Sequence, residues 1–243
     1  MNVTPELVRE FAPTGRLRAA LNMGNPVLAH SKTAADKPAG VSIDLARGFA
    51  ALLGVEVTFM EFDTPGKSGA AVAAREADIG FLAVDPQRAE TIHFTQPYVQ
   101  IEGAYLVRAG SPLQTNEQVD QPGMRVVAGT GSAYELFLSR TLKHAQVVKV
   151  ATSEGVVGEF LGMADTHAAA GVKQQLQADA QRVPGVRLLP GRFMAINQGM
   201  VMPRGNSAAA AALLESYIAQ QKQSGFVAQA LARHGIEGAA VAQ

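Results

Sequence analysis

The first third of the chain alternates short apolar runs with helical patterns, and this order limits the folds that the chain can adopt. Three runs have the apolar content of buried strands: residues 17–23, 55–62 and 77–84. Between them, residues 43–53 repeat apolar side chains at helical spacing, with Ser42 as the expected cap, and residues 69–75 are rich in alanine. A β-α-β-α-β order requires crossover connections, so it predicts a parallel sheet flanked by helices.

A second alternation of the same kind begins near residue 125, and a helical region follows it. We expect strands over residues 103–107, 125–128, 146–150, 167–170, 186–189 and 195–202, and helices over residues 132–142, 152–161, 172–181, 207–223 and 226–233. Two α/β units in tandem predict a two-lobed α/β fold, in which each lobe is a mostly parallel sheet flanked by helices. The cleft between two lobes is a common ligand site.

Composition excludes several classes of function. The 243 residues include 21 Lys and Arg against 21 Asp and Glu, so no basic excess is available for nucleic-acid phosphates, and we expect no nucleic-acid partner. The absence of cysteine excludes disulfides and thiolate zinc sites. The five histidines lack metal-ligand spacing, so we expect no metal and no cofactor. No transmembrane segment is expected, because no apolar stretch approaches the ~20 residues that span a bilayer.

The N-terminus does not resemble a secretion signal. It contains Glu6 and Glu10 and has no apolar segment of the kind found in signal peptides. Either a signal peptide has been removed from this chain, or the natural protein stays in the cytoplasm.

Arg88 follows closely on a buried strand and is the first candidate for binding an anion. The apolar run 79–84 leads into Asp85 and Pro86, and Arg88 comes two residues later. Ligands of open α/β sheets bind at the carboxyl ends of the strands, and the planar guanidinium fork matches a carboxylate. The alternative is a surface arginine that pairs with Glu90 on a short helix. The position of Arg88 after the strand favours the binding role.

A glycine-rich turn lies between the strand expected at residues 125–128 and the next helix. In Gly129-Thr130-Gly131-Ser132 the backbone N–H groups could face a ligand, and the positive end of the helix dipole favours an anion there. Ser132 and Glu135 also have capping-box spacing, so an ordinary capped helix start is an equal alternative. Tyr134 stands where a dinucleotide fingerprint needs its third glycine, which excludes that motif.

No arrangement of residues indicates catalysis, and we identify no catalytic residue. The chain lacks the Gly-x-Ser-x-Gly motif of a nucleophile elbow. Asp85, Glu102 and Lys67 could lie near a cleft, but a solvated or capping role is the simpler interpretation for each of them.

Several motifs, taken in their order and spacing, resemble the bacterial extracellular solute-binding proteins of family 3, the polar amino-acid type. The segments that carry the resemblance are Gly15-Arg16-Leu17-Arg18-Ala19-Ala20, Gly40-Val41-Ser42-Ile43-Asp44-Leu45-Ala46, Ala77-Asp78-Ile79-Gly80, Arg88-Ala89-Glu90, Phe94-Thr95-Gln96-Pro97-Tyr98, Val107-Arg108-Ala109-Gly110-Ser111-Pro112-Leu113, Gly129-Thr130-Gly131-Ser132, Gln198-Gly199-Met200-Val201-Met202-Pro203-Arg204-Gly205-Asn206 and Ser224-Gly225-Phe226. The resemblance implies a type II periplasmic-binding-protein fold. Lobe 1 would comprise residues 1–107 and 195–243, and lobe 2 residues 108–194.

The resemblance also implies a function without catalysis. The lobes would close around a small carboxylate-bearing solute, an amino acid or a related compound, and deliver it to the membrane permease of an ABC importer. Arg88 would hold the carboxylate, and Thr130, Gly131 and Ser132 would add donors from lobe 2. The other residues expected at the ligand are Asn22, Asn25, Lys67, Ala83, Asp85 and Glu102.

Three positions depart from the pattern of the family. Ala83 stands where many members have a Thr or Ser whose hydroxyl assists the ligand, and no aromatic clamp is found near Thr64. Residues 169–172 contain no acid where many members have an aspartate for the α-ammonium group. Because a buried ammonium without a carboxylate partner is costly, we hypothesise a ligand that need not be a standard α-amino acid. Glu102 and Asp85 are the acids that could substitute.

The resemblance further implies a periplasmic location, and we expect a monomer. Two alternatives remain open at this point. One is a dehydratase-like enzyme on the same scaffold, for which Glu102 and Lys67 are the candidate acid–base groups. The other is a ligand-sensing module.

Overall fold

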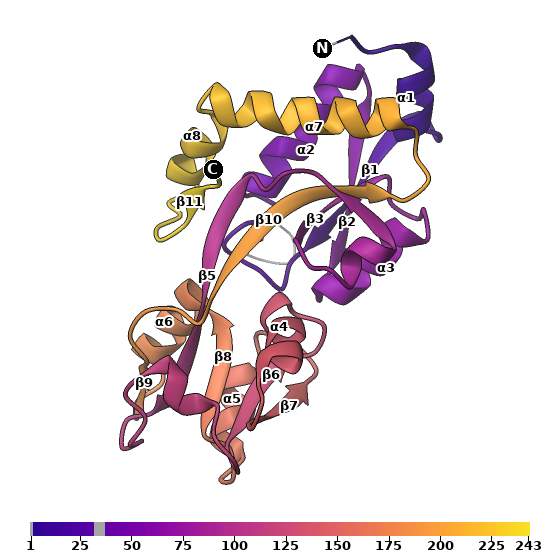
Figure 1. Ribbon diagram of the computed structural model, residues 1–243. Coiled ribbons are helices and arrows are strands. Elements are labelled where there is room, and N and C mark those ends of the chain that lie inside the picture. The colour runs from indigo at the N-terminus through magenta and orange to yellow at the C-terminus, as the bar shows by residue number, and fades with distance from the viewer. Residues whose placement is uncertain (1, 32–36) are drawn as a thin grey trace. The chain divides into compact units, whose positions relative to one another are not determined.

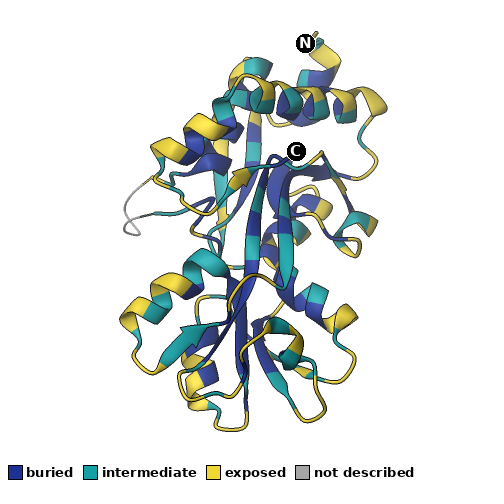
Figure 2. Cartoon of the chain, turned by 60° about the vertical axis from the view of Figure 1, so that its left-hand side comes forward, coloured by how far each residue is buried: buried dark blue, intermediate teal, exposed yellow. Residues whose placement is uncertain are grey.

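The computed structural model describes residues 2–31 and 37–243 (Figure 1). The chain divides into two compact units: unit 1 comprises Met1–Gln100 and Asn197–Gln243, and unit 2 comprises Ile101–Ile196. The central strands of each unit are the most buried elements, as β3 (Ile79–Ala83) and β8 (Ala168–Val172) show, while the helices expose residues along their outer faces (Figure 2).

The chain passes between the two units within two strands, β5 (Val99–Arg108) and β10 (Met194–Pro203). The lobe boundaries expected from the sequence, after residues 107 and 194, fall within these same strands.

The sheet of unit 1 contains the parallel strands that the sequence predicted. Its order is β2 (Glu56–Phe62), β1 (Arg16–Asn22), β3 (Ile79–Ala83) and β10. Strand β1 runs parallel to both β2 and β3, and β10 is antiparallel to β3. Two short strands that the sequence analysis missed complete the unit: β4 (Ile92–Phe94) pairs with β10, and β11 (Ala240–Val241) pairs with β5. The carboxyl ends of β1 and β3 therefore lie at one edge of the sheet.

The helices of unit 1 begin at residues that differ from some predictions. They are α1 (Pro5–Phe11), α2 (Val41–Leu53), α3 (Pro65–Ala73), α7 (Ala208–Gln223) and α8 (Phe226–Arg233). The sequence analysis missed α1 and placed the start of α3 four residues too late, since Thr64 caps it and Pro65 is its first residue. A threonine cap and a proline at the first helical position are both common at helix starts.

Helix α2 is capped by Gly40, so the expectation that Ser42 caps it is wrong. Gly40 has a φ of 132°, and a Cβ atom there would lie 2.3 Å from the Leu28 carbonyl oxygen, so only glycine fits. Ser42 lies inside the helix and is buried, with its hydroxyl 3.3 Å from the Tyr98 hydroxyl.

An ion pair joins β1 to the start of β3. Arg18 donates from Nε and Nη2 to the two oxygens of the buried Asp78 carboxylate, at 3.0 and 2.6 Å. The Arg18 backbone N–H also donates to Asp78, at 2.8 Å. These bonds fix how β3 lies beside β1, and thus where both strands end.

The sheet of unit 2 has the order β5, β8 (Ala168–Val172), β6 (Arg125–Gly129) and β7 (Gln146–Val150). Strand β6 is parallel to both β7 and β8, while β5 is antiparallel to β8 and to the short β9 (Val186–Leu188). The helices are α4 (Ala133–Thr141), α5 (Val156–Gly162) and α6 (Lys173–Arg182). Helix α5 begins four residues later than predicted, because Gly155 is its cap.

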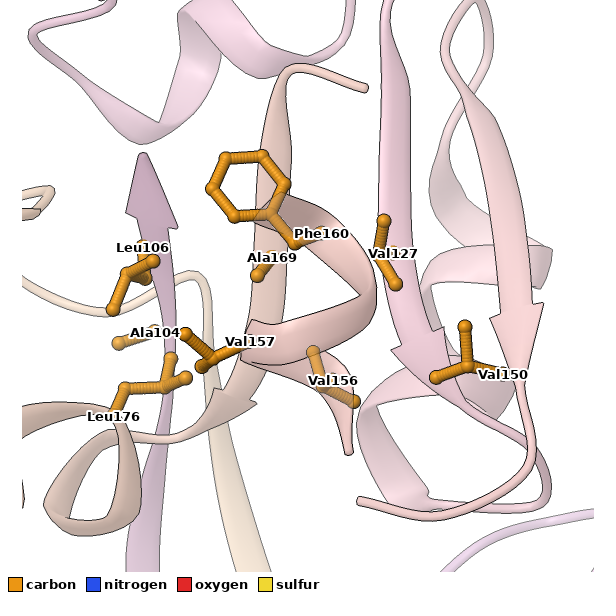
Figure 3. Close-up of a cluster of buried hydrophobic side chains, with 9 residues drawn as sticks. All are labelled: Ala104, Leu106, Val127, Val150, Val156, Val157, Phe160, Ala169 and Leu176. Atoms are coloured by element: carbon orange, nitrogen blue, oxygen red, sulfur yellow. The ribbon is translucent and has the colours of Figure 1, made fainter. Parts of the chain in front are cut away.

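The core of unit 2 forms where α5 and α6 cover the sheet (Figure 3). Phe160, Val156 and Val157 of α5 and Leu176 of α6 pack against side chains of the four strands. The strand residues of this cluster are Ala104, Leu106, Val127, Val150 and Ala169.

Glu135 locks the turn that leads into α4. Ser132 caps the helix as predicted, since its Oγ accepts from the Glu135 N–H at 3.1 Å. The buried Glu135 carboxylate accepts from the Gly131 N–H, the Ser139 hydroxyl and Lys149 Nζ at 2.8–2.9 Å. Burial by itself raises the pKa of Glu135, but these hydrogen bonds outweigh it, so the pKa lies below its usual value.

We predict that Asp78→Ala lowers the free energy of unfolding by about 2–3 kcal/mol, because it leaves the half-buried Arg18 guanidinium without its partner. Urea unfolding measures this change. Glu6→Ala is the control, because it removes an exposed ion pair and should cost much less stability than Asp78→Ala. Equal losses in the two variants would contradict the role given to Asp78.

We predict that Glu135→Gln costs about 1–3 kcal/mol of stability at pH 7, since bonds to a charged group are lost. A lowered native pKa means that the ionised carboxylate stabilises the fold above the ordinary Glu pKa of ~4.3, and that this contribution disappears as pH falls below it. The difference in unfolding free energy between the wild type and Glu135→Gln should therefore become smaller as the pH falls from 7 to 3.

Unfolding free energies at pH 7, 5 and 3 test this prediction. Glu159→Gln, an exposed acid on α5, serves as the control. A gap between wild type and Glu135→Gln that does not change with pH would show that the carboxylate charge does not stabilise the turn.

Candidate functional site

In unit 1, the candidate residues gather at the carboxyl edge of the sheet. Asn22 is the last residue of β1 and Ala83 the last of β3, and these strands are parallel neighbours. The segments that follow them carry Asn25, Asp85 and Arg88. The structure thus brings these five predicted residues to one edge, which is where ligands bind in open α/β sheets.

Arg88 is held over the end of its own strand. It begins a 3-10 turn, η1 (Arg88–Glu90), and its Nη1 donates to the Ala83 carbonyl oxygen at 2.9 Å. Asp85 is buried and caps the turn, because its Oδ1 accepts from the N–H groups of Gln87 and Arg88 at 2.9 and 3.3 Å. Asp85 therefore positions Arg88.

Two asparagines lie at the end of β1 with different environments. The Asn22 amide oxygen accepts from the Gly24 N–H at 3.2 Å. Asn25 is only 9% exposed, and within the described part of the chain its amide oxygen has no hydrogen-bond partner. Leaving a buried acceptor unsatisfied costs about 1–3 kcal/mol. An ordered water molecule is the ordinary partner of such an acceptor in a native fold.

Lys67 belongs to an exposed ion pair on the first turn of α3. Its Nζ lies 2.7 Å from Asp63 Oδ2, and the lysine side chain is 62% exposed. The hydrogen bond from Lys67 is the main cause that lowers the pKa of Asp63. This environment matches the solvated role that the sequence analysis gave as the simpler interpretation.

In unit 2, the turn Thr130–Ser132 uses its backbone donors internally. The Thr130 N–H donates to the Val150 carbonyl at 2.8 Å, the Gly131 N–H to Glu135 and the Ser132 N–H to the Gly129 carbonyl at 3.1 Å. The Thr130 hydroxyl also donates to Val150. The expectation that these N–H groups face a ligand is therefore wrong for this conformation, because each of them donates to a carbonyl or carboxylate oxygen of the protein itself.

Glu102 forms an ion cluster with two cations of unit 2. Its Oε2 lies 2.6 Å from Lys173 Nζ, and its Oε1 lies 3.1 Å from Arg192 Nη1. The hydrogen bond from Lys173 is the largest of the effects that lower the pKa of Glu102, and it outweighs burial, which raises that pKa. Both carboxylate oxygens are thus engaged by cations of the protein.

Sequence reasoning did not identify Lys173 and Arg192 as the partners of Glu102. A signal for Lys173 was present, since it is the first charged side chain after the acid-free stretch 169–172. No comparable signal marked Arg192, which lies 90 positions from Glu102 in the sequence.

Two properties bear on the classes of function considered above. Among residues 2–31 and 37–243, no three His, Asp or Glu side chains are grouped so as to hold a metal ion. No helix in the same part of the chain is long and apolar enough to cross a membrane.

Solved structures with a similar fold include substrate-binding components of ABC transporters. One is an amino acid ABC transporter substrate-binding protein from Streptococcus pneumoniae, bound to L-arginine. Its TM-score with this chain is 0.77 at 18% sequence identity, and the matched region covers 92% of this chain and 96% of that protein. An ancestral arginine-binding protein bound to glutamine has a TM-score of 0.75 at 22% sequence identity, and the matched region covers 92% of this chain and 99% of that protein. These likenesses confirm the two-lobed α/β fold expected from the sequence.

Among curated proteins, no sequence matches the chain. The sequence does match the family model of the bacterial extracellular solute-binding proteins, family 3, over residues 17–236. This match covers nearly the whole chain and confirms the resemblance found in the sequence. The chain belongs to the bacterial extracellular solute-binding proteins of family 3.

Proposed function

We propose that this protein is the solute-binding component of an ABC importer and that it binds a small carboxylate-bearing solute, an amino acid or a related compound. The observation that carries the proposal is the placement of Arg88 at the carboxyl edge of the unit 1 sheet, held by Ala83 and Asp85. Membership of a solute-binding family supports it, as do the amino-acid complexes of proteins with a similar fold.

In this proposal Arg88 binds the carboxylate. The bond from Nη1 to the Ala83 carbonyl orients the guanidinium plane, and the Asp85 cap fixes the backbone that carries it. A guanidinium held in one orientation loses little conformational entropy when it binds a carboxylate with two parallel hydrogen bonds. Ala83 contributes its carbonyl to this arrangement, so a hydroxyl at that position is not needed for it.

The other residues of unit 1 contact the uncharged part of the solute. The buried amide oxygen of Asn25 accepts a hydrogen bond from a donor on the ligand, which would satisfy an acceptor without a partner among the described residues. Asn22 lies on the same edge and shapes the pocket. Val84, which is 45% exposed directly after β3, offers an apolar contact there. Lys67 stays in its exposed pair with Asp63 and acts at the rim.

The candidate residues of unit 2 are those of the turn Thr130–Ser132. This turn leads into α4, which has nine residues, so the positive end of the helix dipole lies there. The internal bonds of Thr130 and Gly131 make this turn rigid, so it offers a fixed surface.

The protein acts by binding alone, as a monomer in the periplasm, and passes its solute to a membrane permease. Support comes from the family, whose members are extracellular solute-binding proteins. The candidate acid–base groups of an enzyme do not favour catalysis, because Glu102 is paired with two cations and Lys67 with Asp63.

We predict that Arg88→Ala weakens binding of the solute by about 2–5 kcal/mol, as expected for the loss of a desolvated charge pair. A thermal-shift screen of amino acids, cyclic amides and small organic acids first identifies a ligand, since a ligand at 100 times its dissociation constant adds ~2.7 kcal/mol to native stability. Calorimetry then compares the wild type with the variant.

Arg16→Ala is the matched control, because this exposed arginine lies at the opposite end of β1 and pairs with Glu56. It should leave the affinity unchanged. Arg88→Lys keeps the charge but not the planar fork, and it should bind more weakly than the wild type. Unchanged affinity in Arg88→Ala would overturn the proposed function.

A further inference from the structure

A hollow with three arginines in its lining lies at the amino end of the unit 1 sheet, opposite the edge that carries Arg88. The arginines are Arg9 of α1, Arg18 of β1 and Arg75, which follows the end of α3. We infer that this hollow binds a phosphate group, either as free phosphate or as part of a small phosphate ester. The site is separate from the solute site proposed above, because none of its lining residues is a candidate there.

The hollow is built from four segments of unit 1 that lie far apart in the sequence. Arg18 is near the start of β1, and Asp78 directly precedes β3, so both mark the amino ends of parallel strands. Glu10 and Asn206 bring α1 and the turn between β10 and α7 to the same place. The volume of the hollow is about 340 Å³, near the lower end of the range of about 300–1,000 Å³ that is typical of small-molecule pockets. The hollow therefore fits a small ligand.

The two acids of the lining are occupied by donors of the protein. Asp78 accepts from the backbone N–H and the guanidinium of Arg18, as described above. Glu10 accepts from the N–H of Ser207, the cap of α7, and from its hydroxyl at 2.8 Å. Three arginines thus stand against two carboxylates, so the hollow keeps one positive charge in excess. An anionic ligand neutralises that charge.

Arg18 and Arg75 keep N–H donors beyond those that the fold uses, since a guanidinium has five of them. Arg18 donates from Nε and Nη2 to Asp78 and to the Arg75 carbonyl oxygen, and its Nη1 has no acceptor in the described part of the chain. Arg75 donates from Nη1 to Asn206 and from Nη2 to the Arg204 carbonyl oxygen, both at 2.9 Å. Its Nε has no acceptor among the same residues. Structural bonds therefore orient both guanidiniums, while donors remain for a ligand.

Arg9 adds a third guanidinium at the exposed side of the hollow. Its Nη2 donates to Glu6 at 2.9 Å, but the two side chains of this pair are 70% and 73% exposed. Exposed ion pairs of this kind contribute little to stability, so Arg9 exchanges Glu6 for a more highly charged partner at small cost. The hollow thus combines two guanidiniums that the fold holds in place with one that is available at its rim.

The backbone of Arg75 indicates that its side chain has a role. Among the described residues, Arg75 is the only one other than glycine with a positive φ, of 60°. It follows the C-cap of α3, a position where glycine is the ordinary residue. A residue with a Cβ atom is strained in this left-handed conformation. Strained residues cluster at binding sites, and here the strained residue places a guanidinium in the lining of the hollow.

Donors from three separate segments suit a phosphate group better than a carboxylate. A phosphate group has three strong acceptor oxygens and carries a charge of about −1.5 to −2 at pH 7. A carboxylate has two oxygens in one plane and a single charge, so one guanidinium fork satisfies it. The hollow therefore favours the tetrahedral anion, for which arginine is the preferred residue because it forms paired hydrogen bonds.

Calorimetry of the full chain with inorganic phosphate, at constant ionic strength in chloride, tests the inference. We expect a dissociation constant of about 1 mM or lower. Arg88→Ala should bind phosphate as tightly as the wild type, because Arg88 lies at the opposite edge of the sheet. Acetate, titrated into Arg88→Ala, should bind at least about tenfold more weakly than phosphate.

Glycerol 3-phosphate, titrated beside inorganic phosphate, separates the two sources of a phosphate group. Tighter binding of the ester would identify a small phosphate ester as the ligand class. Tighter binding of the inorganic ion would identify free phosphate. Both results support a phosphate site at this hollow.

Arg75→Gly and Arg9→Gln should each weaken phosphate binding at least about fivefold. Arg75→Gly gives the left-handed position the residue that it favours, so this variant keeps its fold. Arg16→Gln is the control, because this exposed arginine of β1 pairs with Glu56 outside the hollow, and it should leave the phosphate affinity unchanged. A purely structural role of Arg75 would change the free energy of unfolding without changing this affinity.

Three results would overturn the inference: no binding of either phosphate compound to the wild type, unchanged affinity in both Arg75→Gly and Arg9→Gln, or acetate binding as tight as that of phosphate. Loss of phosphate binding in Arg88→Ala would also overturn it, because the phosphate would then lie at the other edge of the sheet. The proposed function is tested separately by solute affinity, which Arg88→Ala should lower and Arg75→Gly should leave unchanged.

Discussion

Parallel strand pairing is the constraint on which the candidate residues of each unit depend. Where neighbouring strands are parallel, their carboxyl ends meet at one edge, and residues far apart in sequence become neighbours. In unit 1 this edge joins Asn22 to Ala83, and the ion pair of Arg18 with Asp78 fixes the two strands that carry them. In unit 2 the pairing of β6 with β8 performs the same task for the turn at Ser132 and for Lys173.

The sequence predicted those elements whose signals are local. Apolar periodicity located the parallel strands, and Ser132 was recognised as the cap of α4. The start of α2 was missed because its cap is a glycine chosen for close approach to the Leu28 carbonyl, a contact that no local pattern reveals. The short strands β4 and β11 were missed for a similar reason, since each exists only through pairing with a distant strand.

The same distinction applies to the candidate site. Arg88 was found because its partners, Ala83 and Asp85, lie within five residues of it. The environment of Glu102 could not be found in this way, because its partners lie 71 and 90 positions away. The turn at Gly131 is an intermediate case: the capping-box spacing was visible, but whether its N–H groups bind a ligand or Glu135 depends on the rotamer of that side chain.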